Sequence, residues 1–244
     1  MASMYRFDGE TIEGQLAQLT GDEAHHAINV KRIKPGEAVW LTDGKGRLSK
    51  GVVESVTSGI FAVRISEVET VSQPSLTFVL VQALAKGDRD ELAVQAATEL
   101  GVHGVIPWQA NRSVSRWEGA KVSKQVSRWQ SICDEACKQS LRASFPRVEQ
   151  PIDSRELAAK IQNQSSTWLI LDPTSKTSIT QVALPKSGEV FLVVGPEGGI
   201  TDEELAAFES NGASRVNLGS GILRTSTAGM AALSHLSARA GFWD

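Results

Sequence analysis

Hydrophobic and polar positions from about residue 73 onward fall into blocks that predict β-strands followed by α-helices. The apolar runs predicted as strands are Leu76–Ala83, Val102–Ile106, Trp168–Leu171, Val190–Val194 and the shorter run Val216–Leu218. The segments between them carry apolar residues three and four apart, as in Val122, Val126 and Trp129, and this spacing predicts helices. Strands and helices that alternate in this way imply a mostly parallel sheet with helices on both faces.

Capping residues predict where three of these helices begin. Thr201 is followed three residues later by Glu204, which predicts a capping box and a helix from residue 202. Asp88 and Glu91 have the same spacing, and Ser154 precedes a helical pattern over residues 155–162. The last predicted helix covers residues 227–240.

Residues 1–72 have a different pattern, which predicts a small domain of their own. Thr20–Glu23 matches a capping box and predicts a helix that carries His25 and His26. After it, short strands are predicted at Ala38–Thr42, Leu48–Val56 and Ile60–Val71, separated by glycine-containing turns. Several short strands with such turns favour a compact β-barrel, and Val71–Ser75 is the predicted join to the second domain.

Composition allows one large or two modest globular domains and indicates no disordered or fibrous protein. The 244 residues are 41% hydrophobic and 22% charged. No apolar run reaches the length of a membrane span, and the first residues lack an apolar signal region, so we expect a cytoplasmic protein. Cys133 and Cys137, four apart in a helical pattern, are expected to be packing residues, and no metal site is predicted.

Charge is distributed unevenly along the chain. The net charge is −3, which by itself does not indicate a nucleic-acid partner. Between residues 106 and 148, however, eight lysines and arginines face three carboxylates. This basic segment includes Asn111–Arg116, a loop expected at the carboxyl end of a strand, where functional loops lie. Its alternative interpretation is a solvated helix face.

Two glycine-rich loops, Gly195–Thr201 and Gly219–Ser226, follow successive predicted strands, as does the loop Asp172–Lys176. We expect the three loops to converge on one pocket at the carboxyl ends of the strands. Four carboxylates, at residues 197 and 202–204, lie at the start of the helix after the first loop and would repel a phosphate. A cationic ligand without phosphate, such as S-adenosylmethionine, fits better, although the glycines alone are equally explained by two tight turns.

Eight runs occur in an order that resembles the RsmE family, the 16S ribosomal RNA uridine N3-methyltransferases of the SPOUT superfamily. The runs are His25–Glu37, Asp43–Gly46, Lys86–Arg89, Val94–Gly101, Arg112–Val114, Gln139–Arg142, Gly195–Gly199 and Ile222–Thr225. The resemblance implies methylation of N3 of a specific uridine in the 16S rRNA of the small ribosomal subunit, with S-adenosylmethionine as methyl donor. The sequence departs from the family pattern at two positions, Gly221 and Ser226.

The fold class that the resemblance implies is α/β. It consists of a PUA-like RNA-binding β-barrel over residues 1–72 and a C-terminal SPOUT domain over residues 73–244, a parallel-sheet methyltransferase domain with a trefoil knot. The resemblance further implies a homodimer with the cofactor pocket near its interface.

Site residues follow from the loops and the resemblance together. The residues expected to bind the cofactor are Leu171, Asp172, Val194, Gly195, Glu197, Gly198, Leu218, Ile222, Leu223, Thr225 and Ala228. Glu197 is expected either to pair with the cofactor's ammonium, to remove the proton from N3, or only to cap the following turn; Arg224 is expected to steady a uracil anion or an RNA phosphate. The residues expected to hold RNA are Arg112, Arg116, Gln139, Arg142 and Lys86. Trp40 and Trp108 are expected mainly in the core, with base stacking as the alternative.

Three rival interpretations remain at this stage. A related SPOUT enzyme could methylate a ribose 2′-hydroxyl or another base. A non-catalytic RNA-binding or ribosome-assembly factor with a decayed pocket would account for Gly221 and Ser226. An enzyme with a phosphate-containing cofactor is the most distant of the three.

Overall fold

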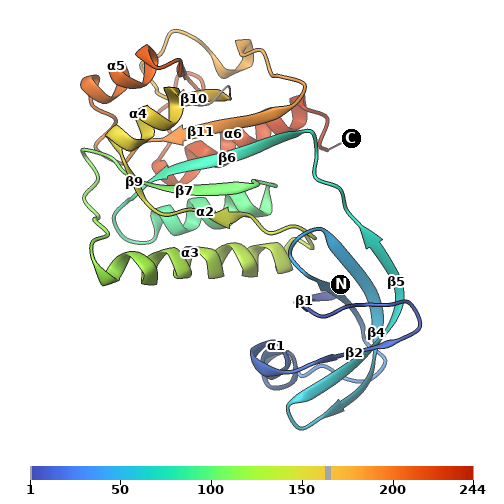
Figure 1. Cartoon of the computed structure of the whole chain (residues 1–244). Helices are drawn as coiled ribbons and strands as arrows, with labels where there is room; N and C mark the ends of the chain where they lie inside the picture. The colour runs from blue at the N-terminus through green and yellow to red at the C-terminus, as the bar shows by residue number, and fades with distance from the viewer. Residues whose placement is uncertain (1, 163–165, 244) are drawn as a thin grey trace. The chain divides into compact units, whose positions relative to one another are not determined.

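The computed structural model describes residues 2–162 and 166–243, which form two compact units (Figure 1). One unit contains the described residues up to Gln73 together with Cys137–Phe145, and the other contains Pro74–Ala136 and the described residues from Pro146 onward. Among the described residues, every helix is too short or too polar to span a membrane.

The smaller unit is built on one curved five-stranded sheet. Its strands are β1 (Ser3–Arg6), β2 (Leu16–Leu19), β3 (Ala38–Thr42), β4 (Arg47–Thr57) and β5 (Ile60–Thr70), in the order β1-β3-β4-β5-β2. The predicted strands β3, β4 and β5 are confirmed, whereas β1 and β2 were not predicted because four residues are too few to show a period. Register shifts between β4 and β5 at Lys50/Gly51 and Val53/Ser55 allow this long pair to bend.

The capping box predicted at Thr20 is wrong. A short helix, α1 (Gly21–His25), begins there and continues as one π-helical turn over His26–Val30, but the Thr20 side chain makes no capping hydrogen bond. The Glu23 carboxylate instead accepts a hydrogen bond from Lys138 Nζ at 2.8 Å. An ion pair with a nearly buried lysine outweighs a local cap, because a charged donor in a dry setting binds more strongly than an exposed backbone N–H.

The larger unit is the predicted parallel sheet with helices on both faces. Its strands are β6 (Leu76–Ala83), β7 (Gly104–Gln109), β8 (Arg147–Val148), β9 (Ile152–Asp153), β10 (Thr167–Leu171), β11 (Gly188–Val194) and β12 (Ser214–Val216). The order is β12-β10-β11-β6-β7-β8, with β9 also on β7, and every pair is parallel. The two central strands, β11 and β6, are therefore neighbours in space although about half the chain separates them.

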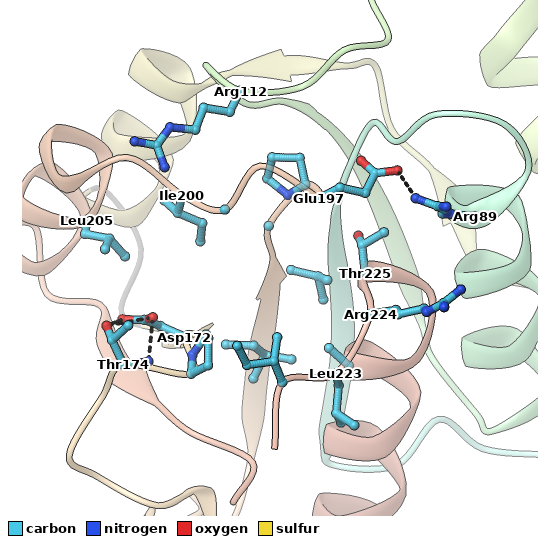
Figure 2. Close-up of a pocket in the computed structure, with 18 of the residues that line it drawn as sticks. Arg89, Arg112, Asp172, Thr174, Glu197, Ile200, Leu205, Leu223, Arg224 and Thr225 are labelled. Carbon is cyan, nitrogen blue, oxygen red and sulfur yellow. Dashed lines mark hydrogen bonds and ion pairs between the residues drawn. The ribbon is translucent and has the colours of Figure 1, made fainter. Parts of the chain in front are cut away.

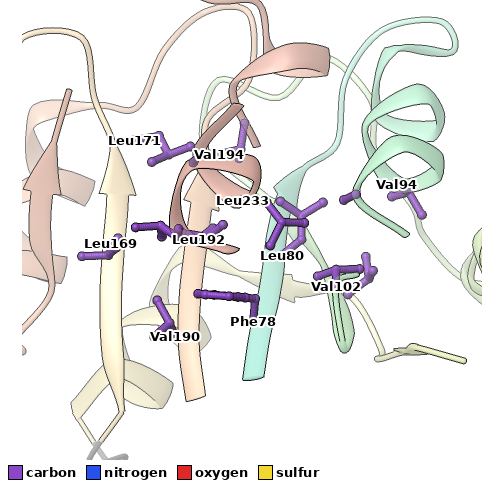
Figure 3. Packing of buried hydrophobic residues seen from close by; sticks show 14 of the residues in the cluster. Phe78, Leu80, Val94, Val102, Leu169, Leu171, Val190, Leu192, Val194 and Leu233 are labelled. Carbon is purple, nitrogen blue, oxygen red and sulfur yellow. The ribbon is translucent and has the colours of Figure 1, made fainter. Parts of the chain in front are cut away.

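Two apolar layers hold the helices to this sheet. The helices are α2 (Arg89–Glu99), α3 (Ala120–Gln139), α4 (Ser154–Gln162), α5 (Asp202–Ser210) and α6 (Thr225–Arg239), with a 3-10 turn at Ile179–Gln181. Phe78 and Leu80 of β6 point to the layer that contains Leu233 of α6 and residues of α2 and α3 (Figure 3). Val79 and Val81 point to the opposite layer, with α4 and α5. This alternation is expected for a strand buried on both faces.

Helix starts near the sheet show one correct prediction and two corrections. The capping box of α5 is confirmed, because Glu204 N donates to Thr201 Oγ1 at 3.2 Å and Thr201 N donates to the Glu204 carboxylate at 2.9 Å. Asp88 precedes α2 but forms no side-chain cap; Asp90 instead accepts from Ala85 N at 3.0 Å.

The start of α4 is also different from the prediction. Asp153 and Glu156 exchange backbone-to-carboxylate hydrogen bonds, both at 2.8 Å, and so perform the capping predicted for Ser154. The Ser154 hydroxyl contacts Glu204 and Trp108 Nε1 instead.

Candidate functional site

A cavity of about 610 Å³ opens at the carboxyl ends of β10 and β11, beside the first turn of α6 (Figure 2). It is lined by the three loops that were expected to converge. The lining residues are Arg89, Arg112, Leu171–Thr174, Val194–Glu197, Gly199, Ile200, Asp202, Leu205, Ile222–Thr225 and Ala228. Parallel α/β sheets bind ligands at this edge, so the cavity is the candidate site.

Most of the residues expected to bind a cofactor line this cavity. Two do not: Leu218 lines a smaller hollow that shares Leu171, Asp172 and Leu223 with it, and Gly198 stands next to lining residues in the glycine loop. Pro173, Thr174, Pro196, Gly199 and Ile200 also line the cavity; they lie within the predicted loops but were not singled out as binding residues. Asp202 was expected at this end of the helix, whereas the sequence did not indicate Arg89 and Leu205. Arg89 and Leu205 lie on α2 and α5, outside the predicted loops, and no local signal marks them as pocket residues. The roles themselves stay predictions.

The floor of the cavity depends on one close approach between α6 and the sheet. A Cβ at Gly229 would lie 2.9 Å from Leu80 Cδ1 and 3.3 Å from Val194 Cγ2. Glycine therefore lets α6 settle against β6 and β11, with Thr225 and Ala228 of its first turn facing the cavity.

The loop Gly195–Gly199 is a tight turn that also needs its glycines. A Cβ at Gly195 would lie 2.7 Å from Ile200 Cγ1, and Gly199 has φ +75° while its N–H donates to Pro196 O at 2.9 Å. An L side chain would clash at the first position and be strained at the second. Bare main chain is consequently exposed to the cavity.

Glu197 is held by two donors from the segment around the start of α2. Its carboxylate accepts from Lys86 N at 3.1 Å. It also accepts from Arg89 Nη1 at 3.0 Å (Figure 2). Burial would raise the pKa of Glu197, but the backbone N–H groups of Glu197 and Lys86 and the Arg89 guanidinium outweigh it and lower that pKa. Glu197 is thus an ionised, weakly basic carboxylate. It does not cap α5, since Thr201 does so.

Asp172 also satisfies its carboxylate inside the protein. Arg215 Nε donates to it at 2.7 Å and Thr174 N at 3.0 Å. Burial would raise the pKa of Asp172, yet these hydrogen bonds and the positive charge of Arg215 outweigh the burial and lower it. The ion pair fixes the end of β10 to β12 and leaves the loop after Asp172 to form the cavity wall.

Asp202, Glu203 and Glu204 lie in the first turn of α5 as expected, but the four carboxylates do not all face the cavity. Glu204 is 3% exposed and points inward, where it accepts from Asn111 N at 2.8 Å and from the Ser154 hydroxyl. Glu203 is not among the lining residues, and Glu197 is neutralised by Arg89. The cavity instead carries mixed charge, with Arg89, Arg112 and Arg224 facing Asp172, Glu197 and Asp202. Acidity alone therefore does not exclude a phosphate from it.

Two arginines of the predicted RNA-binding loop stabilise the loops around the site. Arg112 Nη1 donates to Gly198 O at 3.0 Å, and Arg116 Nη2 donates to Asn111 O at 3.1 Å. Both side chains are exposed, and each guanidinium has five N–H donors, so these bonds leave donors for a phosphate. Lys86 is exposed at the other side of the glycine loop.

The remaining candidates lie elsewhere. Gln139, at the end of α3, and Arg142 belong to the smaller unit, and their RNA-binding role stays a prediction. Trp108 is fully buried and packs on Phe208 with ring centroids 5.6 Å apart, so it is a core residue rather than a stacking surface. Trp40 is half-buried beneath Lys50 Nζ. Cys133 and Cys137 are both buried, and no cluster of His, Cys, Asp or Glu within residues 2–162 and 166–243 could hold a metal ion.

Comparison with known proteins identifies relatives along the whole chain. The family described as an RNA methyltransferase domain matches residues 72–237, and the family described as an RNA methyltransferase PUA domain matches residues 19–66. The chain is 38% identical to ribosomal RNA small subunit methyltransferase E of Mycobacterium bovis, over 100% of this chain and 94% of that protein. The protein of the same name from Bacillus subtilis is 32% identical, over 92% and 91% of the two chains.

A solved structure gives the same picture in three dimensions. The crystal structure of a ribosomal RNA small subunit methyltransferase E from Neisseria gonorrhoeae, bound to S-adenosyl methionine, superimposes with a TM-score of 0.87 at 29% sequence identity. The superposition covers 98% of this chain and 98% of that one.

Proposed function

The chain belongs to the RNA methyltransferase family that contains ribosomal RNA small subunit methyltransferase E, and we propose from this premise that it methylates N3 of one uridine in 16S rRNA. The methyl donor in this proposal is S-adenosylmethionine, which is bound in the structure from Neisseria gonorrhoeae. The family assignment confirms the expected fold class of a PUA-like domain followed by a SPOUT parallel-sheet domain. The trefoil knot stays a prediction.

The cavity at the strand ends is the observation that carries the proposal. Its walls combine apolar side chains such as Val194, Ile200 and Leu205 with exposed main chain of the glycine loop. Apolar walls suit a purine and a thioether chain, and main-chain N–H and C=O groups supply the hydrogen bonds that orient them. Leu171, Asp172, Gly195, Leu223 and Ala228 are the residues that would hold the donor. When bound, S-adenosylmethionine supplies a methyl group on a positively charged sulfur.

The chain's own task is to align the uracil and to manage the proton on N3. N3 becomes nucleophilic once that proton leaves, so either a base or positive charge that stabilises the uracil anion is required. Glu197 is a poor base because Arg89 and Lys86 N stabilise its ionised form. Arg224 lines the cavity, and among the described residues no hydrogen bond or ion pair engages its guanidinium. In this proposal Arg224 stabilises the uracil anion and Glu197 organises the loop.

The same proposal extends to partners. The target base must be unpaired, because N3 is buried in a Watson–Crick pair. Arg112, Arg116, Gln139, Arg142 and Lys86 would contact the phosphate backbone of the 16S rRNA in the small subunit. A homodimer and a cytoplasmic location complete the proposal as it follows from the family.

A tritiated-methyl transfer assay on small ribosomal subunits tests the function directly. We expect label in 16S rRNA, and nucleoside mass spectrometry should identify N3-methyluridine. Label found as 2′-O-methyluridine, or no transfer despite cofactor binding, would reject the proposal in favour of another SPOUT activity or a binding factor.

A further inference from the structure

Gln82 is a polar residue at a position where the sheet is otherwise apolar. The residues of β6 that face α2 and α6 are Leu76, Phe78 and Leu80, and Gln82 continues this row as its fourth member. Its side chain is 0% exposed. In register it lies between Val194 of β11, which lines the cavity, and Pro107 of β7. A buried amide directly below the site requires an explanation, because a leucine here would continue the core at no polar cost.

The hydrogen bonds of Gln82 define the orientation of its amide. Nε2 donates to Ala83 O at 3.1 Å and to Thr225 Oγ1 at 2.9 Å. Since Ala83 O can only accept, the amide nitrogen must face it. Oε1 is buried and has no hydrogen-bond partner in the part of the chain that the structure describes. The side chain thus gives both of its hydrogens to two acceptors and accepts none in return, which costs stability.

The consequence for Thr225 is that its hydroxyl is already used as an acceptor. Thr225 is the first residue of α6, only 6% exposed, and part of the cavity lining. Its own hydroxyl hydrogen has no acceptor among the hydrogen bonds of the described residues. Because Gln82 occupies the lone-pair side of the oxygen, the hydrogen is left to bond with an acceptor atom of whatever fills the cavity.

We propose that Gln82 is a positioning residue that, through Thr225, presents a hydrogen-bond donor to an acceptor atom of the methyl donor. The inference rests on the proposed function, since it takes S-adenosylmethionine as the molecule in the cavity. Thr225 is nearly buried and lines the cavity together with Val194 and Ala228. A compact molecule such as the methyl donor can reach this position more easily than a base that is attached to an RNA chain. We therefore take the methyl donor, and not the RNA, as the partner of the Thr225 hydroxyl. Leaving Oε1 unpaired destabilises the fold, but the same orientation of the amide holds the Thr225 hydroxyl in place as a hydrogen-bond donor to the ligand.

Calorimetric titration of the full-length protein with S-adenosylmethionine tests this network. Gln82→Met keeps the volume and removes both the unpaired Oε1, which is favourable, and the donor to Ala83 O, which is unfavourable, so the variant should fold with a Tm close to that of the wild type. We nevertheless expect its Kd for S-adenosylmethionine to rise about 5- to 10-fold, the usual loss for one oriented hydrogen bond. Leu76→Met, in the same row but at the far end of β6, is the matched control and should leave the Kd unchanged.

A double-mutant cycle separates positioning from a general packing effect. Thr225→Val should weaken binding as Gln82→Met does, Thr225→Ser should retain binding, and Gln82→Met should add nothing in the Thr225→Val background. An unchanged Kd for Gln82→Met, or additive effects of the two substitutions, would overturn the inference while the wild-type protein still bound the donor. Failure of the wild-type protein to bind S-adenosylmethionine would instead overturn the proposed function.

Discussion

Replacing Glu204 by alanine tests whether one buried carboxylate fixes the loops around the cavity. One of its oxygens accepts from Asn111 N at 2.8 Å and from the Ser154 hydroxyl, and the other accepts from Thr201 N at 2.9 Å. These three donors belong to the loop after β7, to the start of α4 and to the loop before α5. The cavity-lining residues Arg112 and Ile200 are direct neighbours of two of them.

The expected loss follows from the number and burial of these bonds. A hydrogen bond to a charged group contributes roughly 1.5–3 kcal/mol. The three bonds to Glu204 therefore set a high upper limit on the stability that Glu204→Ala can remove. Asn111 is exposed, and Ser154 and Thr201 are half-buried, so water replaces part of what Glu204→Ala removes. We therefore expect the free energy of unfolding of the larger unit to fall by about 3 kcal/mol. With a urea dependence of about 2 kcal/mol per molar, the midpoint should fall by about 1.5 M.

The urea unfolding transition can be followed by tryptophan fluorescence. This signal reports mainly on the larger unit, because only Trp40 of the six tryptophans in the sequence belongs to the smaller unit. Glu203→Ala is the matched control, since Glu203 lies on the same turn of α5 but is exposed. Its midpoint should shift far less. Equal shifts for the two variants would refute the reasoning, because Glu204 would then act only as one more carboxylate at a helix start.

Three further predictions follow from the charged residues. The folded-state pKa of Asp172 lies below its unfolded value, so the Asp172–Arg215 pair contributes stability above about pH 4, and this stability is lost as the pH falls further. In urea unfolding, Asp172→Asn should lower the free energy of unfolding by about 1–3 kcal/mol at pH 7 and by almost nothing near pH 2. Glu197→Gln should keep the single-turnover methyl-transfer rate within about 3-fold and leave the pH–rate profile between pH 6 and 9 unchanged, and a loss above about 100-fold with donor binding intact would identify Glu197 as the base after all. Arg112→Ala and Arg142→Ala should each weaken RNA binding and lower the slope of log Kd against log salt by about 0.7–0.9, whereas unchanged slopes would remove these residues from the RNA-binding surface.

The sequence predicted the elements whose patterns are strong within a short window. β10 and β11 contain uninterrupted apolar runs, β6 is apolar except at Thr77 and Gln82, and the capping box of α5 is complete within four residues. β8 and β9 have only two residues each and show no period. Local pattern therefore determined the central sheet but not its edges.

Two of the three wrong caps, at Thr20 and Asp88, share one physical cause. Glu23 and Glu91 both have the spacing of capping-box partners, but Glu23 binds Lys138, 115 residues away, and Glu91 binds Arg128, 37 residues away. A cation supplied by the tertiary fold competes with the local N–H, and no window of the sequence contains it.

The sequence predicted which loops form the site, but it did not predict how the charged residues of the site pair. The alternation of elements predicts parallel strands, whose carboxyl ends lie at one edge of the sheet, so the convergence of three loops could be inferred. The pairing of Glu197 with Arg89 and of Asp172 with Arg215 joins residues 108 and 43 positions apart, and these pairings change which carboxylates face a ligand. The resemblance to a family supplied the reaction, which periodicity and composition could not.

The placement of Gly229 against Leu80 and Val194 has a consequence for biosynthesis. The first turn of α6 provides the bottom of the ligand compartment, and it is translated after almost everything else in the larger unit. A nascent polypeptide that has not yet reached Thr225 therefore has its glycine loop but no compartment to bind the methyl donor. The enzyme becomes competent only after α6 has been translated and has packed against the sheet, and donor binding can report that this helix has docked.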